Sequence, residues 1–301
     1  MKASGIPHNR IDLDYLLTKA GLDPAEVRRT VRTALDEDLQ YGPDVTTDAT
    51  VGTNAEATAD IVARQTGTLA GLPVAVAVLA AIGVPLEGIT IKRQDGETIA
   101  KGSVVMNVRG PLRKILGAER TLLNFMTHLS GIATNTRAWV DAIKGTGCVV
   151  RDTRKTTPGL RALEKYAVRC GGGRNHRMGL GDEALIKDNH VLAAGSIKAA
   201  IEAVRKTDPD IFLEVECDTL KQVKEALAMG AKLILLDNMS LGDIKAAVTL
   251  GKDFPGTSFE ASGGLRLETA RSVAETGVDY ISVGALTHSS PAVDLALDVR
   301  R

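Results

Sequence analysis

The sequence IFLEVE at 211–216 is followed by LILLD at 233–237, SFEAS at 258–262 and YISVG at 280–284. Each segment is short and apolar and ends in polar or small residues. The ends of successive segments lie 21, 25 and 22 residues apart, and helical patterns such as Leu220 to Met229 fill the intervals. Parallel strands need a crossover connection of about this length, so the repeats predict a parallel sheet with helices between its strands.

Two earlier segments, CVVRDTR at 148–154 and ALIKD at 184–188, bring the number of visible strands to six. Six strands are compatible with an open doubly wound sheet or with a complete or incomplete (β/α) barrel. A barrel takes functional groups from the ends of many strands, whereas a doubly wound sheet more often has one site at its switch point. Nearly every strand here ends in a functional or small residue, which favours the barrel: Arg154, Lys187, Glu216, Asp237, Ser262 and Gly284.

The first part of the chain has a different pattern. Residues 10–39 predict two helices, and residues 57–109 predict strands around a helix, after a turn-rich stretch at 42–48. Pro111 opens a long helical pattern. This mixture is typical of an α+β domain.

Composition excludes several classes of protein. The 301 residues contain 37 basic and 37 acidic side chains, which argues against a general nucleic-acid binder. Three scattered cysteines favour a reducing compartment over a disulfide framework. No signal peptide is visible, and the longest apolar stretch, 74–82, is far shorter than the ~18 residues of a membrane span. A cytoplasmic protein is therefore expected, without membrane or nucleic-acid partners.

Residues 151–177 hold eight basic and two acidic side chains, next to the glycine loop 171–173. Such a run is often only a solvated basic helix face. Because it begins at a strand end and flanks a loop where a ligand can approach the backbone, it favours a site for a small molecule with several carboxylates or phosphates. The basic residues are Arg151, Arg154, Lys155, Arg161, Lys165, Arg169, Arg174 and Arg177.

Four other residues have more than one interpretation. His176 is either structural or a hydrogen-bond donor to a carboxylate. Lys187 could form a Schiff base, clamp an anion or pair with Asp188. Glu216 and Asp237 could pair with the basic cluster, bind ribose hydroxyls with Mg²⁺, or stabilise positive charge on a sugar ring.

The turns Ser262-Gly263-Gly264 and Val283-Gly284-Ala285 predict an anion site, since small residues expose backbone N–H groups at late strand ends. A Walker A loop and a G-x-G-x-x-G motif are absent, and no His/Cys cluster has zinc spacing.

The combined motifs resemble the quinolinate phosphoribosyltransferase family over nearly the whole chain. The matching runs are ERTLLNF at 119–125, LSGIAT at 129–134, DTRKTTPGLR at 152–161, GGG at 171–173, NHR at 175–177, LIKDNH at 185–190, EVE at 214–216, LDNM at 236–239, SGG at 262–264 and SVGA at 282–285, with GPDVTT at 42–47.

The resemblance implies an α/β sandwich domain at 1–130, on which the tail 287–301 is expected to pack. It also implies an open, incomplete α/β barrel of type II phosphoribosyltransferase architecture at 131–286. It implies a homodimer or larger assembly in which Arg120 of the neighbouring subunit completes each site. The implied reaction joins quinolinate to 5-phosphoribosyl-1-pyrophosphate, with Mg²⁺, and gives nicotinate mononucleotide, pyrophosphate and carbon dioxide for NAD biosynthesis.

The resemblance also assigns roles by position. Arg120, Arg154, His176, Arg177 and Lys187 would hold quinolinate, with Thr153 also at the substrate. Lys155 and Lys187 would border the pyrophosphate, and Glu216 and Asp237 would meet ribose and the metal. The 5-phosphate would lie on the turns Ser262-Gly263-Gly264 and Val283-Gly284-Ala285. Lys155, Lys187, Glu216 and Asp237 are the expected catalytic groups.

Three alternatives stay open at this point. A relative acting on nicotinate without decarboxylation would need fewer cations. A Schiff-base aldolase would use Lys187 as its nucleophile. A non-enzymatic barrel would bind its ligand without turnover.

Overall fold

The computed structural model describes residues 11–300, which form two compact units that we describe separately. The first unit contains the chain up to Asn135, the segment Thr157–Gly171 and the chain from Ser290 onward. The second contains Thr136–Thr156 and Gly172–Ser289. Helix α5 (Leu112–Ala142) runs from the first unit into the second.

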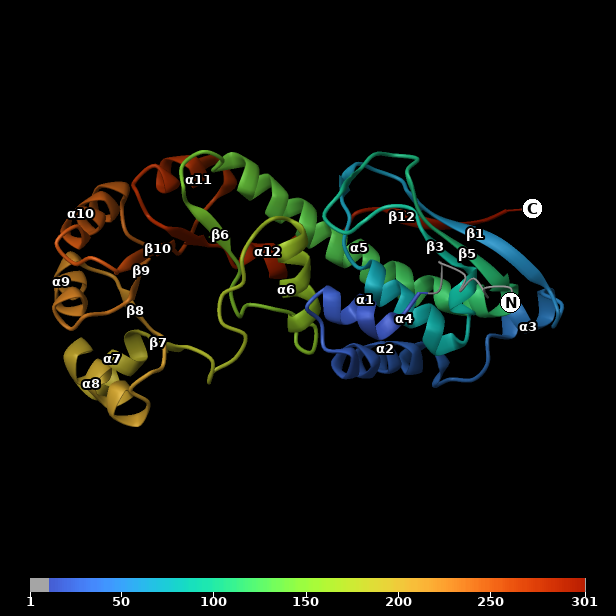
Figure 1. Ribbon diagram of the computed structural model, residues 1–301, viewed down its shortest axis with the longest axis horizontal. Coiled ribbons are helices and arrows are strands. Elements are labelled where there is room, and N and C mark those ends of the chain that lie inside the picture. Colours follow the sequence, from blue (N-terminus) through green and yellow to red (C-terminus); the bar gives the residue numbers. More distant parts are fainter. Residues whose placement is uncertain (1–10, 301) are drawn as a thin grey trace, which may run out of the picture. The chain divides into compact units, whose positions relative to one another are not determined.

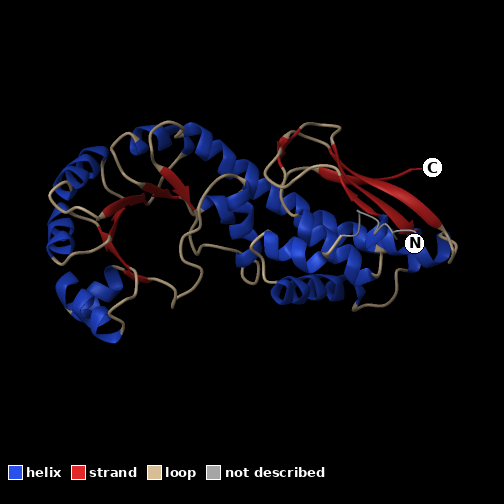
Figure 2. Ribbon diagram, in the orientation of Figure 1, coloured by secondary structure: helices blue, strands red, loops and turns tan. Residues whose placement is uncertain are grey.

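The first unit is a four-stranded antiparallel sheet with helices beside it (Figure 2). The strand order is β12-β1-β5-β3, so β12 (Leu295–Arg300) pairs with β1 (Glu56–Ala63) although they lie far apart in sequence. The other strands of this unit are β2 (Gly67–Thr68), β3 (Ile89–Ile91), β4 (Thr98–Ile99) and β5 (Val104–Pro111). Its helices besides α5 are α1 (Leu13–Lys19), α2 (Pro24–Leu39), α3 (Val45–Thr50), α4 (Leu72–Ile82), α6 (Arg161–Cys170) and the 3₁₀ turn Leu86–Gly88.

Helix α4 is buried in the core of this unit, and a side chain from another segment caps its N-terminus. Its residues from Leu72 to Leu79 are buried, because its sequence LPVAVAVL offers apolar side chains on every face. Its N-cap is Gly71, which has no side chain to cap the first turn. Asp95 supplies the acceptor instead, since its Oδ2 lies 2.8 Å from Gly71 N and 3.1 Å from Leu72 N. The hydroxyl of Tyr166, on α6, donates to the same oxygen.

Replacing Asp95 with Ala should lower the free energy of unfolding by about 2–3 kcal/mol, because three donors lose their acceptor. Burial raises the pKa of the Asp95 carboxyl, while the hydrogen bonds from Tyr166, Gly71 and Leu72 act in the opposite direction. Asp95→Asn is the matched control, since an amide oxygen can take the place of Oδ2, and we expect it to retain most of the stability. Chemical denaturation measures both variants, and an equal loss in the two would contradict the capping role.

The second unit is a six-stranded parallel sheet of order β6-β11-β10-β9-β8-β7. The first and second strands along the chain lie at opposite edges and do not pair, so the sheet is an open barrel (Figures 1 and 2). The strands are β6 (Val149–Arg151), β7 (Ala184–Ile186), β8 (Leu213–Cys217), β9 (Leu233–Asp237), β10 (Ser258–Ser262) and β11 (Tyr280–Ser282). The helices are α7 (Asp188–Ala194), α8 (Ile197–Thr207), α9 (Leu220–Ala228), α10 (Leu241–Gly251), α11 (Leu267–Ala274) and α12 (Ala285–His288).

All six strands expected from the sequence are present, and the predicted open barrel is confirmed. The turn-rich stretch at 42–48 differs from expectation, because Asp44 accepts from Thr47 N and thereby starts the short helix α3. By their internal contacts, the compact units place 157–171 in the first unit, and the domain limits at 1–130 and 131–286 stay a prediction. Within residues 11–300, no helix combines the length and apolar character that crossing a bilayer requires.

Candidate active site

A cavity of about 570 Å³ lies at the carboxyl ends of the barrel strands. Four basic side chains, two carboxylates and His176 line it, which suits a polyanionic ligand with a hydroxyl-rich part. Most of the residues expected from the sequence meet there: Thr153, Arg154, Lys155, His176, Arg177, Lys187, Glu216, Asp237, Ser262, Gly263 and Gly264. The cavity wall also includes Leu185, Leu235, Asn238 and Ser282.

Some expected site residues do not line this cavity. Val283, Gly284 and Ala285 follow β11 beside it, where a Cβ at Gly284 would lie 2.8 Å from Lys155 Cδ. Gly284 thus leaves room for the Lys155 side chain, and Thr287 Oγ1 donates to the Lys155 carbonyl at 2.8 Å. Arg120 is exposed on the part of α5 that belongs to the first unit.

The basic run at 151–177 is not one site. Of its eight basic residues, only Arg154, Lys155 and Arg177 line the cavity. The members on α6 belong to the first unit, where Arg169 donates to the carbonyl of Ala20 at 2.8 Å. A second cavity of about 810 Å³ lies in that unit, lined by α2, α5 and residues 157–160. Its lining includes no residue expected to bind quinolinate or the phosphoribosyl group, so the barrel cavity is the better candidate.

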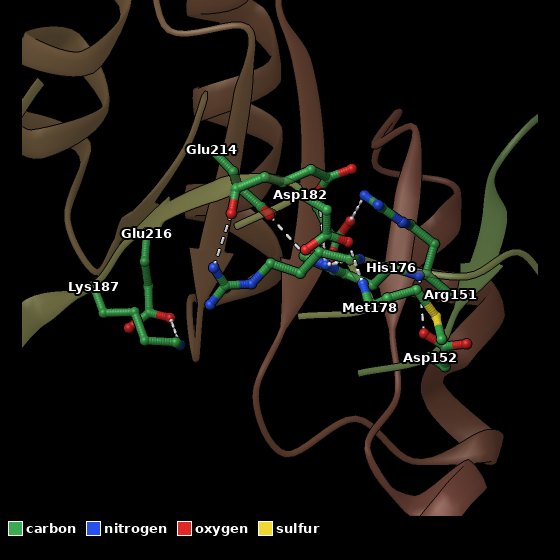
Figure 3. A network of polar contacts seen from close by, with 11 residues as sticks. Arg151, Asp152, His176, Met178, Asp182, Lys187, Glu214 and Glu216 are labelled. Atoms are coloured by element: carbon green, nitrogen blue, oxygen red, sulfur yellow. Dashed lines mark hydrogen bonds and ion pairs between the residues drawn. The ribbon is translucent and has the colours of Figure 1, made fainter. Parts of the chain in front are cut away.

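The two carboxylates of the cavity come from neighbouring strands. Glu216 is the last but one residue of β8 and contacts the Lys187 ammonium, and the two side chains are paired in Figure 3. Asp237 ends β9, and its Oδ2 accepts from Asn238 Nδ2 at 2.6 Å. The β9–β10 register places Ser262 directly beside Asp237. The sheet therefore brings the expected ribose-binding and phosphate-binding groups next to each other.

Gly263 is held against Asn238. Its φ is +85°, and a Cβ there would lie 2.4 Å from Asn238 Cγ. Asn238 itself has a φ of +52°, which is uncommon for a residue other than glycine. Only glycine therefore fits at 263 without displacing the amide that contacts Asp237.

Gly263→Ala should weaken binding of 5-phosphoribosyl-1-pyrophosphate by about tenfold or more, because the new methyl group displaces Asn238 and with it Asp237. Gly264→Ala is the matched control. Its φ of +58° brings similar backbone strain, but its Cβ would lie 3.7 Å from Asn238 Oδ1. Titration calorimetry with each variant measures the difference, and equal weakening would show that backbone strain alone is responsible.

The segment Asn175–Arg177 is held in place by several hydrogen bonds. Asp152 accepts from Asn175 Nδ2 at 2.5 Å and from His176 N at 2.8 Å. His176 Nδ1 in turn accepts from Arg177 N at 2.7 Å. The buried Arg177 guanidinium donates to the Glu183 carbonyl at 3.0 Å. Arg177 is therefore fixed at its backbone and at its side chain.

Two buried carboxylates beside His176, Glu214 and Glu260, have no role in the sequence prediction, and they lie near Arg151 of the basic run (Figure 3 labels Arg151 and Glu214). Glu214 on β8 and Glu260 on β10 have no exposed surface, and Arg151 Nη1 on β6 lies 2.7 Å from Glu260 Oε2. Burial raises the pKa of the Glu214 carboxyl to about 7. Burial, and then the nearby Glu214, raises the pKa of Glu260. A glutamate in the middle of an apolar strand was the signal available in the sequence.

An open α/β barrel with a cationic cavity at its strand ends is typical of an enzyme that acts on a small polyanionic substrate. Two family models match the chain: the N-terminal domain of quinolinate phosphoribosyl transferase at 44–130 and its C-terminal domain at 132–298. The chain belongs to the quinolinate phosphoribosyltransferase family.

Similar proteins agree with this assignment. The chain is 50% identical to the nicotinate-nucleotide pyrophosphorylase (carboxylating) of Mycobacterium leprae, over 90% of this chain and 96% of that protein. It is 38% identical to quinolinate phosphoribosyltransferase (decarboxylating) 2b of Nicotiana tabacum, over 99% and 90%. The structure of the nicotinate-nucleotide pyrophosphorylase from Francisella tularensis superposes with a TM-score of 0.86 at 37% identity, over 97% and 98%.

Proposed function

We propose that this protein transfers the phosphoribosyl group of 5-phosphoribosyl-1-pyrophosphate to quinolinate, with loss of carbon dioxide. The products are nicotinate mononucleotide and pyrophosphate, as required for NAD biosynthesis. Family membership over both units supports the reaction. The cavity supports placing this reaction at the strand ends of the barrel, because four basic side chains line it: Arg154, Lys155, Arg177 and Lys187.

Quinolinate has two adjacent carboxylates, and the cavity supplies cations for both. Arg154 and Arg177 would bind them with paired N–H groups, because a guanidinium matches a carboxylate with two parallel hydrogen bonds. Lys187 adds a third positive charge beside Glu216. Nicotinate, with one carboxylate, would leave part of this charge unmatched, which favours quinolinate as the substrate.

The second substrate would extend across β8 to β11. Glu216 and Asp237 would accept hydrogen bonds from the ribose hydroxyls, and Lys155 and Lys187 would border the pyrophosphate. The 5-phosphate would lie on the backbone N–H groups of the turns that follow Ser262 and Val283.

Glu216 and Asp237 also fit Mg²⁺, since carboxylate oxygens are its preferred protein ligands and one or two are usual when substrate phosphates provide others. The ion would neutralise charge on the departing pyrophosphate.

The chemical step needs no nucleophile from the protein. The pyridine nitrogen attacks the anomeric carbon as pyrophosphate leaves, and Glu216 and Asp237 stabilise the positive charge that develops on the sugar. The ring nitrogen is then quaternary and positive. It stabilises the electron pair left at the 2-position when that carboxylate departs as carbon dioxide, and this carbon then takes up a proton from water to give nicotinate mononucleotide. The protein contributes positioning and electrostatic stabilisation.

The assignment is tested by incubating the purified protein with quinolinate, 5-phosphoribosyl-1-pyrophosphate and Mg²⁺. Carbon dioxide and nicotinate mononucleotide should appear in equal amounts. A parallel reaction with nicotinate should be much slower. Faster turnover of nicotinate would reverse the substrate assignment, and borohydride trapping of an adduct at Lys187 would indicate the aldolase alternative.

We also propose that the protein is a homodimer or larger assembly in which Arg120 of one subunit reaches the barrel cavity of its neighbour. The exposed position of Arg120 on α5 is compatible with this role. A cytoplasmic location stays a prediction from the sequence.

A further inference from the structure

The imidazole of His176 lies between a backbone N–H and two buried carboxylates. Its Nδ1 accepts from Arg177 N at 2.7 Å. Its Nε2 lies 2.9 Å from Glu214 Oε2 and 3.7 Å from Glu260 Oε1. Glu183 Oε2 lies 3.9 Å from Nδ1, and the His176 backbone N–H is held by Asp152.

These contacts select one form of the ring. An acceptor is required at Nδ1, because the Arg177 N–H points at it. A neutral imidazole has one ring proton, so that proton lies on Nε2, the nitrogen 2.9 Å from Glu214 Oε2. The neutral tautomer with its proton on Nε2 satisfies both conditions, whereas the opposite tautomer violates both.

Burying the carboxylates of Glu214 and Glu260 costs free energy of folding, which indicates that they have a role. Glu214 and Glu260 have no exposed surface, and burying a carboxylate costs several kcal/mol unless charged or polar partners surround it. Arg151 Nη1 contacts Glu260 from β6, and His176 contacts Glu214 from the loop before β7. Apolar side chains would fill these interior strand positions at lower cost, as Leu233 and Leu235 do at the positions of β9 in register with Glu214 and Glu260.

We propose that Glu214 and Glu260 are positioning residues that hold His176 as the Nε2–H tautomer, so that its Nδ1 fixes the backbone of Arg177 at the quinolinate-binding part of the cavity. This inference rests on the proposed function, because Arg177 is assigned there to quinolinate. It differs from the expectation that His176 itself binds the substrate, since Nδ1 accepts from Arg177 N and Nε2 lies 2.9 Å from Glu214 Oε2.

The first test observes the unmodified protein and uses one variant only to assign the signal. Histidine-selective ¹⁵N labelling of the whole protein gives signals from five histidines, and His176→Asn identifies the one of interest. Without substrate, the His176 signals should show a protonated Nε2 and an unprotonated Nδ1. A protonated Nδ1, alone or in an imidazolium, would overturn the proposal.

The second test measures whether the contact between Glu214 and His176 affects KM for quinolinate. Glu214→Leu removes the carboxylate that lies beside Nε2 and should raise KM for quinolinate about tenfold, while KM for 5-phosphoribosyl-1-pyrophosphate changes less than about twofold. Glu214→Gln is the matched control, because its amide oxygen can still accept from Nε2, and it should keep the tautomer and KM. An equal rise in both KM values would overturn the proposal.

A double-mutant cycle separates positioning from a general effect on stability. If Glu214 acts through His176, adding Glu214→Leu to His176→Asn should raise KM for quinolinate little further. Additive losses would contradict the proposed chain of contacts. The ¹⁵N spectrum is recorded without substrate, so absence of quinolinate turnover would count against the proposed function and leave the tautomer result standing.

Discussion

Arg177→Ala should weaken quinolinate binding by about a hundredfold or more while leaving the affinity for 5-phosphoribosyl-1-pyrophosphate nearly unchanged. Arg177 is 8% exposed, and its backbone and guanidinium are both held, so it is a preorganised cation in the cavity wall. Removing one member of a buried, hydrogen-bonded charge pair costs about 2–5 kcal/mol, and a hundredfold loss is about 3 kcal/mol. The effect should be confined to the dicarboxylate, because the phosphate-binding turns follow other strands.

Calorimetric titration with each substrate separately measures this difference. Arg174→Ala is the matched control: Arg174 lies in the same loop, but it is exposed and outside the cavity. It should leave both affinities unchanged. Quinolinate affinity that survives Arg177→Ala would remove Arg177 from the site.

Arg120→Ala and Lys187→Ala should each abolish most activity, and mixing the two proteins should restore part of it. In a dimer with shared sites, a mixed pair has one site with both defects and one site with neither. Random exchange makes about half of the dimers mixed, so about a quarter of the wild-type activity should return. This is a large effect, since each variant alone should be nearly inactive.

The control mixture is Lys187→Ala with Glu216→Ala. Both residues belong to the same barrel cavity, so every mixed dimer has a defect in each site and no activity should return. Subunit exchange is checked by mass spectrometry of labelled and unlabelled chains. Exchange without recovery in the first mixture would exclude Arg120 from the neighbouring site.

Local patterns predicted the elements of the barrel well. Each apolar segment of the repeat became a strand, because β-branched and aliphatic runs bounded by turns have few other stable conformations in a buried sheet. The ends of those strands also indicated the site, since parallel strands deliver their carboxyl ends to one edge. Glu216, Asp237 and Ser262 line the cavity for this reason.

Other features depended on contacts between distant residues. The run of basic residues at 151–177 is continuous in sequence, yet α6 places part of it in the first unit. The close approach of Gly263 to Asn238 follows from the pairing of β10 with β9. A local pattern carries no information on such pairings, because they are set by long-range packing and strand register.

The sequence by itself determined the family, the six strands and the strand-end residues, because these depend on local composition and on spacing along the chain. Only the tertiary structure decided how His176 is used. Glu214 and Glu260 come from separate strands, and Arg177 is held through Nδ1 of its neighbour. The positions of these groups around His176 decide which ring nitrogen carries the proton. They come together only when the barrel has formed.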